Sequence, residues 1–106
     1  MISEERLEKA MRFLAETDLQ SAELKTQVER KDYLVDLVRK RIFLGVTGNI
    51  EERKAKAEQD PEVQEAHEEY LEAMLEWEKL RAKRATEELI VEVFRTLEAS
   101  RRQGRI

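Results

Sequence analysis

The feature that most constrains this chain is a stretch of more than forty residues without a helix breaker. Its start, "DPE", is a strong helix signal: Asp60 can cap a helix, and Pro61 suits the first helical position, where its missing N–H costs nothing. The next Gly or Pro is Gly104. A helix over residues 61–102 would be roughly 60 Å long, whereas a compact domain of this size has a radius of gyration of about 13 Å. The sequence therefore predicts a helix that projects or pairs with another chain.

The composition agrees with a helical protein. Ala, Glu, Lys, Leu and Arg supply 62 of the 106 residues, a profile typical of long helices and coiled coils. The absence of cysteine excludes disulfides and thiolate metal sites. Capping residues and glycines divide the chain before Asp60 into shorter helices. Among these signals are a Thr17–Gln20 capping box and a left-handed helix end at Gly45. Together they predict a single helical domain, residues 1–106, with helices over about 4–16, 19–44, 50–58 and 61–102.

The expected fold class is all-α: a helical hairpin or small bundle with one long, coiled-coil-like C-terminal helix, completed by oligomerisation. A dimer is the simplest oligomer, because the helix over 19–44 is too short to cover the long one. Alternating spacings of three and four residues predict the apolar seam of the oligomer. Its residues are Val63, Tyr70, Trp77, Leu80 and Phe94. A bend near residues 81–88, which would fold the long helix back on itself, stays open as an alternative.

Residues suited to catalysis are scarce. His67 is the single histidine, and "HEEYL" lacks the second histidine of a zinc helix because Leu71 stands in its place. The glutamates around His67 are interpreted as a solvated acidic face. We expect no enzymatic activity, no catalytic residues, no metal or other cofactor and no small-molecule substrate. With no apolar leader and no apolar run long enough for a bilayer, we expect a cytoplasmic protein without membrane contact.

Charge is unevenly distributed along the chain. Residues 45–80 carry eleven acids and four bases, whereas residues 81–106 carry four acids and seven bases. Cations near a helix C-terminus stabilise its dipole, and nearby glutamates can pair with them; contact with phosphates or an acidic partner is the second explanation. Arg53 and Arg84 are harder to explain on an exposed helix, and a buried or bidentate partner such as a carboxylate would make arginine the fitting choice for each. The candidate contact residues are Arg81, Lys83, Arg84, Arg95, Arg101, Arg102 and Arg105.

The order of three motifs, "RFLAETDLQSAELKTQVER", "FLGVTGNIEERKAKA" and "LRAKRATEELIVEVFRTLEASRRQGRI", resembles a family of small, largely uncharacterised tailed-phage and prophage proteins. Phe94 stands where that family has Trp. The resemblance implies a helical protein encoded near replication and recombination genes. The residues that carry it include Thr17, Asp18, Gly48, Glu52, Arg53, Ala55, Ala57, Arg84, Arg95, Arg101, Arg102, Gly104 and Ile106.

Two functional hypotheses follow. In the first, the protein is a non-enzymatic accessory protein of phage DNA replication or recombination. It would contact single-stranded DNA, or a single-strand-binding or annealing protein, through its basic C-terminal helix. In the alternative, it is a protein–protein adaptor or an inhibitor of a host or phage enzyme, and its contact surface is the acidic face of residues 51–78.

Overall fold

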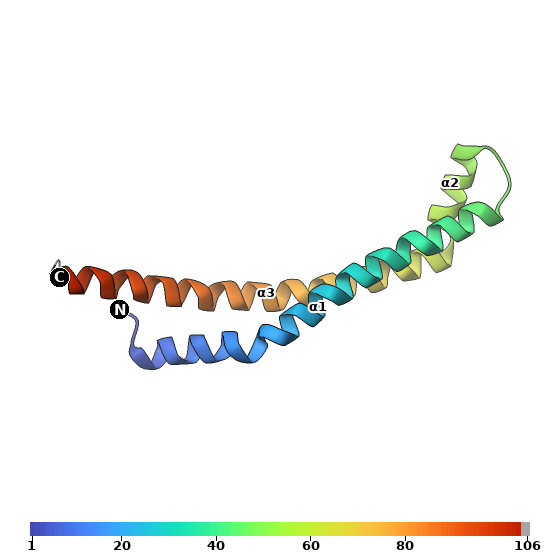
Figure 1. Ribbon diagram of the computed structural model, residues 1–106. Helices are drawn as coiled ribbons and strands as arrows, with labels where there is room; N and C mark the ends of the chain where they lie inside the picture. The colour runs from blue at the N-terminus through green and yellow to red at the C-terminus, as the bar shows by residue number, and fades with distance from the viewer. Residues whose placement is uncertain (105–106) are drawn as a thin grey trace. The chain divides into compact units, whose positions relative to one another are not determined.

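Three helices account for most of residues 1–104, the part of the chain that a computed structural model describes (Figure 1). α1 covers Glu4–Gly45, α2 covers Ile50–Gln59 and α3 covers Pro61–Arg102. Residues 1–104 contain no strand, which confirms the predicted all-α class. Contacts divide the chain, for which a single domain is predicted, into two compact units. Unit 1 joins residues 1–22 to the chain from residue 78 onward, and unit 2 is the continuous stretch 23–77.

Side-chain caps explain where the helices begin. Ser3 Oγ accepts a hydrogen bond from the Arg6 N–H at 3.0 Å, and Asp60 Oδ1 accepts one from the Glu62 N–H at 2.8 Å. Asn49 Oδ1 accepts the Glu52 N–H at 2.8 Å at the start of α2. Each cap satisfies an N–H group that has no partner within its own helix. The starts at Ser3, Asn49 and Asp60 thus follow the sequence signals.

Unit 1 is an antiparallel pair of helix segments. The N-terminal half of α1 lies beside the C-terminal half of α3, with Arg6 against Glu87 and Thr17 against Arg84. The buried residues between the segments are small or few: Ala10 is fully enclosed and Leu80 is nearly so. Polar contacts between the two segments therefore carry much of the specificity of their pairing.

Unit 2 contains the other halves of the long helices together with α2. Its buried side chains are Val28 and Val35 from α1, Ala57 from α2 and Val63 from α3. Ion pairs surround this small core: Lys31 Nζ lies 3.2 Å from Glu69 Oε2, and Arg39 pairs with Glu58 and Arg41 with Glu62. Exposed ion pairs of this kind contribute about 0–1 kcal/mol each, so the packing of small apolar side chains dominates.

The predicted break between helices at residues 17–18 is wrong, because α1 is continuous from Glu4 to Gly45. The Thr17 hydroxyl does not cap a new helix. It donates to the Phe13 carbonyl at 2.7 Å, one turn back in the same helix. A threonine that bonds to the carbonyl four residues before it is compatible with a continuous helix, so the capping-box pattern at this position is coincidental.

The loop between α1 and α2 differs from the prediction in its glycines. Gly45 is the last residue of α1 and does not adopt a positive φ, whereas Gly48 has φ +124°. A Cβ at residue 48 would lie 2.7 Å from Glu52 Oε2 and 3.0 Å from Glu52 Cβ. Gly48 is therefore the residue on which this turn depends, both for its backbone conformation and for space.

α3 is continuous through residues 81–88, so the bend considered from sequence is absent. The predicted oligomer seam serves the fold of the single chain: Val63 is 2% and Leu80 9% exposed. Tyr70, Trp77 and Phe94 are half-buried within their units. Val63 and Leu80 are therefore occupied inside one chain, whereas a contact of Tyr70, Trp77 and Phe94 with a second chain stays a prediction.

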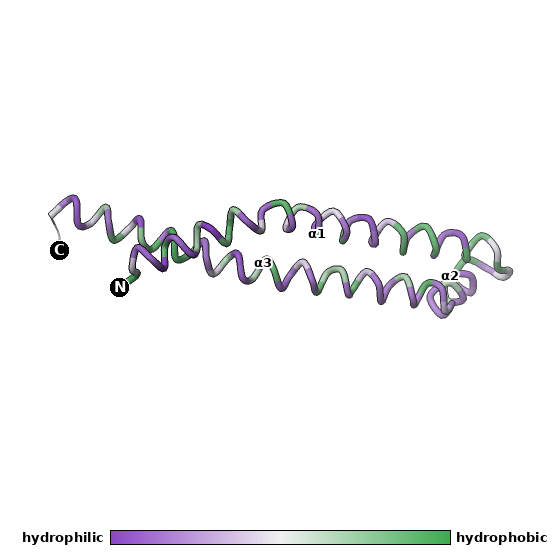
Figure 2. Tube along the Cα trace, turned by 90° about the horizontal axis from the view of Figure 1, so that it is seen from below, coloured by the Kyte–Doolittle hydropathy of each residue, from purple (hydrophilic) through white to green (hydrophobic). Residues whose placement is uncertain are grey.

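Many large apolar side chains remain at the surface. Figure 2 shows that hydrophobic positions recur among hydrophilic ones along both long helices. Leu44 is 74%, Leu19 71% and Leu89 58% exposed. Further exposed apolar residues include Met11, Tyr33, Leu34, Leu37, Leu71, Leu75 and Val93. No helix in the described part of the chain combines the length and apolarity needed to cross a membrane.

Candidate functional site

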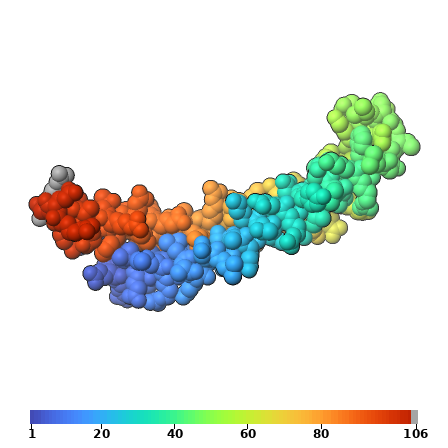
Figure 3. All heavy atoms as spheres, in the orientation of Figure 1, coloured from blue at the N-terminus to red at the C-terminus, as the bar shows by residue number. Residues whose placement is uncertain are grey.

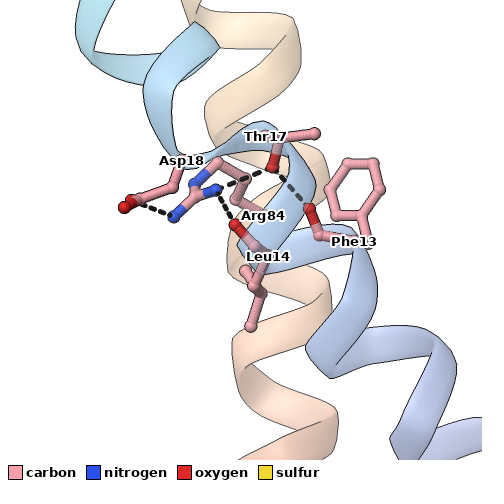
Figure 4. Close-up of polar contacts among 5 residues, drawn as sticks. All are labelled: Phe13, Leu14, Thr17, Asp18 and Arg84. Carbon is pink, nitrogen blue, oxygen red and sulfur yellow. Dashed lines mark hydrogen bonds and ion pairs between the residues drawn. The ribbon is translucent and has the colours of Figure 1, made fainter.

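Arg84 forms a clamp between the two segments of unit 1 (Figure 4). Its Nη1 donates to the Leu14 carbonyl at 2.9 Å and to Thr17 Oγ1 at 2.7 Å, and its Nη2 lies 3.4 Å from Asp18 Oδ1. The Arg84 side chain is only 16% exposed. Its shortest hydrogen bonds go to a carbonyl and a hydroxyl rather than to a carboxylate, and its guanidinium is occupied within the chain.

A second arginine pair supports unit 1 one turn further along α3. Arg6 Nη2 donates to Glu87 Oε1 at 2.9 Å, and Arg6 Nη1 lies 2.8 Å from Glu87 Oε2. The Glu87 side chain is 19% exposed, and Oε2 is shielded from solvent with no hydrogen bond beyond this ion pair. The hydrogen bond from Arg6, helped by its charge, lowers the pKa of Glu87 below its ordinary value, although partial burial opposes the shift.

Arg53 joins α2 to the end of α1 in unit 2. Its Nε donates to the Phe43 carbonyl at 3.1 Å, and its guanidinium carbon lies 4.4 Å from the centre of the Phe43 ring. A planar guanidinium can stack on an aromatic ring and donate hydrogen bonds at its edge, which an ammonium cannot do. A specific partner was expected for Arg53, and the structure identifies it as Phe43.

Several residues that carry the phage-protein resemblance come together in space. Thr17, Asp18 and Arg84 form the clamp of unit 1. In unit 2, Gly48 lies against Glu52, next to Arg53. Structural roles therefore account for these residues, and the contact surface has to be sought among the others.

The remaining cations of α3 face solvent. Lys83, Arg95 and Arg102 are exposed, and no ion pair or hydrogen bond of their side chains is found within the described residues. Arg81 and Arg101 are exposed as well, and they pair along the helix with Glu78 at 3.2 Å and Glu98 at 3.1 Å. Arg105 lies outside the described residues. The six described candidates thus split into one structural residue, Arg84, and five exposed ones.

The C-terminal end of α3 projects beyond the start of α1 (Figures 1 and 3). α1 begins at Glu4, only two residues before Arg6, and Arg6 lies opposite Glu87. The segments are antiparallel, so residues 1–6 lie beside α3 past Glu87, where Ile90, Val91 and Phe94 are half-buried, and only the last turns of α3 extend beyond them. Arg95, Arg101 and Arg102 therefore lie on a length of helix that is open to a ligand from several sides.

The acidic and histidine-containing surface lies in unit 2. His67 is exposed and stacks on Tyr70, with ring centroids 6.1 Å apart. It borders a half-open cavity of about 340 Å³ that is also lined by Arg39 and Glu58. Within residues 1–104, no group of three or more His, Cys, Asp or Glu side chains is arranged to hold a metal ion. The cavity brings one cation, one imidazole and two glutamates together.

Sequence reasoning missed the acceptors of these contacts. It singled out Arg84 and Arg53 but not the Leu14 and Phe43 carbonyls, and it did not pair Arg6 with Glu87. Backbone carbonyls carry no sequence signal, and the Arg6–Glu87 pair spans 81 positions.

Comparisons of this chain with protein-family models, with curated proteins and with solved structures found no match.

Proposed function

We propose that this protein is a non-enzymatic accessory protein of phage DNA replication or recombination. It contacts single-stranded DNA, or a protein that binds it, through the projecting basic end of α3. The resemblance to small phage proteins supplies the expectation of a role in DNA metabolism. The observation that carries the proposal is the exposure of Arg95, Arg101 and Arg102 on a helix end that α1 does not cover.

The proposed mechanism is electrostatic docking on phosphates. Exposed arginines neutralise backbone phosphates and release condensed counterions, which gives affinity without base selectivity. Arg102 has no pairing partner among the described residues, and Arg101 shares only an exposed contact with Glu98. Exchanging that contact for a phosphate costs little, because exposed pairs are weak.

The test is a salt titration of binding to a labelled single-stranded oligonucleotide, with Arg95, Arg101 and Arg102 replaced together by Ala. We expect the parent affinity to fall log-linearly with salt, with a slope near −0.7 per phosphate neutralised. The triple variant should bind more weakly and with a slope reduced by about 2.

The matched control removes the same charge from unit 2, by replacing the exposed residues Lys25, Arg30 and Lys54 with Ala. A general charge effect would weaken both triple variants equally and would contradict the assignment to α3. Absence of binding at low salt would instead favour an adaptor. Leu71 and Leu75, 43% and 54% exposed on the acidic stretch 51–78, offer such an adaptor a surface for a protein partner.

A further inference from the structure

We propose that a second copy of this chain docks on the outward face of α3 in unit 1. The two α3 helices would form a parallel, two-stranded coiled coil over residues 82–100. This inference concerns self-association and does not depend on which anionic partner the basic end contacts. It also assigns the oligomer to a different surface from the seam predicted by sequence, two of whose residues, Val63 and Leu80, are buried inside one chain.

The face consists of uncharged side chains at the spacing of a coiled-coil seam. Successive positions are four, three, four, three and four residues apart, which is the alternation of a heptad repeat. At 100° per residue, Val93 lies about 180° from Arg84 on the helix, so the face points away from α1. Leu89 is 58% and Val93 39% exposed. The positions are Ala82, Thr86, Leu89, Val93, Thr96 and Ser100.

The two threonines on this face have already used their donors within the helix. Thr86 Oγ1 donates to the Ala82 carbonyl at 3.2 Å, and Thr96 Oγ1 donates to the Glu92 carbonyl at 3.1 Å. A buried hydroxyl is costly when its hydrogen bonds are unmade. Since these bonds exist before association, the threonines can be buried against a second helix at little cost.

The projecting end of α3 gives a second argument for a partner helix. The last turns of this helix extend beyond the start of α1 and continue to Arg102. A single helix of that length is marginal in water, and helices in proteins are stabilised chiefly by packing of an apolar face. Ile90 and Leu97 lie next to Leu89 and Val93 and widen the apolar face. A second copy supplies the missing neighbour.

Side-chain types and charges favour the parallel orientation. Parallel two-stranded coils prefer β-branched residues at a and Leu at d, and here Thr86 and Val93 occupy a positions and Leu89 a d position. Glu78 is then at g and Lys83 at e, five residues later, which is the spacing of an interhelical ion pair. An antiparallel coil centred on this face would instead place Glu92 beside Glu92 of the second copy.

The first experiment uses single cysteines in this cysteine-free chain. Under mild oxidation, Thr96→Cys should form a disulfide-linked homodimer, because the same d position meets itself in a parallel coil. Glu88→Cys, an equally exposed position on another face, is the matched control and should remain uncrosslinked. If Thr96→Cys crosslinks only when mixed with Thr86→Cys, the pair is antiparallel and the proposal is overturned.

The second experiment measures mass by sedimentation equilibrium over a concentration series. We expect a monomer–dimer equilibrium that Leu89→Glu weakens by about tenfold or more, with helix content unchanged by circular dichroism. Leu44→Glu, the same change at a more exposed leucine of unit 2, should leave the equilibrium as in the parent. A parent that is monomeric throughout the series, or a dimer lost in Leu44→Glu and kept in Leu89→Glu, would refute the proposal.

A charge exchange tests the pairing itself. Glu78→Lys and Lys83→Glu should each weaken the dimer, and the double variant should recover the parent's affinity, because the attractive pair is restored with its sign reversed. Glu78 also contacts Arg81 in the same chain. Glu78→Lys removes this contact, and the double variant does not restore it. Recovery therefore reports on the contact between chains, and additive weakening would exclude it.

Discussion

At the scale of single residues, the arginines of α3 have two different uses. Arg84 serves two acceptors at once through Nη1 and reaches Asp18 through Nη2. A lysine ammonium at the end of a flexible stem cannot reproduce that fork, even though its charge is the same. Within residues 1–104, the exposed side chains of Lys83, Arg95 and Arg102 make no ion pair or hydrogen bond, so charge alone is what they offer.

Arg84→Lys is therefore expected to lower the free energy of unfolding by about 1–3 kcal/mol, because buried acceptors lose a charged donor. Urea denaturation followed by circular dichroism measures the change. Arg102→Lys, an exposed position on the same helix, is the control and should stay within about 0.5 kcal/mol of the parent. Equal stability of the parent and Arg84→Lys would show that the clamp is dispensable.

The Arg6–Glu87 pair predicts a pH dependence. The pKa of Glu87 in the folded chain is lower than its ordinary value of 4.5, chiefly through the hydrogen bond from Arg6. The stabilisation is therefore fully present above pH 4.5 and is lost as the pH falls toward the lowered pKa. The stability difference between the parent and Glu87→Gln should shrink from neutral pH to acid. Asp36→Asn, which removes a different carboxylate with a lowered pKa, calibrates the contribution of other acids. A difference that stays constant with pH would contradict this.

At the scale of elements, the starts of the helices were predictable and the interior of α1 was not. Ser3, Asn49 and Asp60 act on N–H groups two or three residues away, so their effect is local and readable in the sequence. Thr17 looked like another cap, but its hydroxyl is shared between the Phe13 carbonyl and Arg84, which is 67 residues away. The role of the Thr17 hydroxyl depends on a partner far away in the sequence, and a local sequence pattern cannot reveal such a partner.

The turn between α1 and α2 gives a prediction about glycine. Gly48→Ala should destabilise the protein by about 1–3 kcal/mol, because φ +124° is strained for alanine and its Cβ would collide with Glu52. Gly45→Ala should be neutral or stabilising by up to about 1 kcal/mol, since no atom lies within 4 Å of the added Cβ. Thermal unfolding of the two variants gives the comparison, and an equal effect would contradict the assignment of the turn to Gly48.

At the scale of the whole molecule, the sequence predicted helices, and the structure added which segments of the chain pair with each other. Residues 1–22 belong to the same unit as the residues after 77. Among the candidate contact residues, exposure separates Arg84, which is used within the chain, from Arg95 and Arg102, whose contact with a partner stays a prediction. Accessibility depends on where α1 begins relative to α3, and no motif encodes that.

If two copies pair in parallel, their basic ends lie at the same end of the coil, and both can bind one long anionic strand. Leu89→Glu should then reduce affinity for a long single-stranded oligonucleotide more than for one that spans a single basic end, because only the long strand gains from two linked contacts. Fluorescence anisotropy at matched salt measures both affinities. Equal losses on the two oligonucleotides would show that the contacts act singly.

The division of the units along the sequence sets the order in which they can form on the ribosome. Residues 23–77 are contiguous, so unit 2 can close as soon as they have emerged. Residues 1–22, by contrast, are made before any of their partners from residue 78 onward. At about 5–20 residues per second, the first segment waits roughly 3–11 s for residue 78 alone. During synthesis, residues 1–22 are therefore exposed to chaperones and proteases without their partner segment. If translation stopped early in α3, the apolar side chains of residues 1–22 would have no segment to pack against.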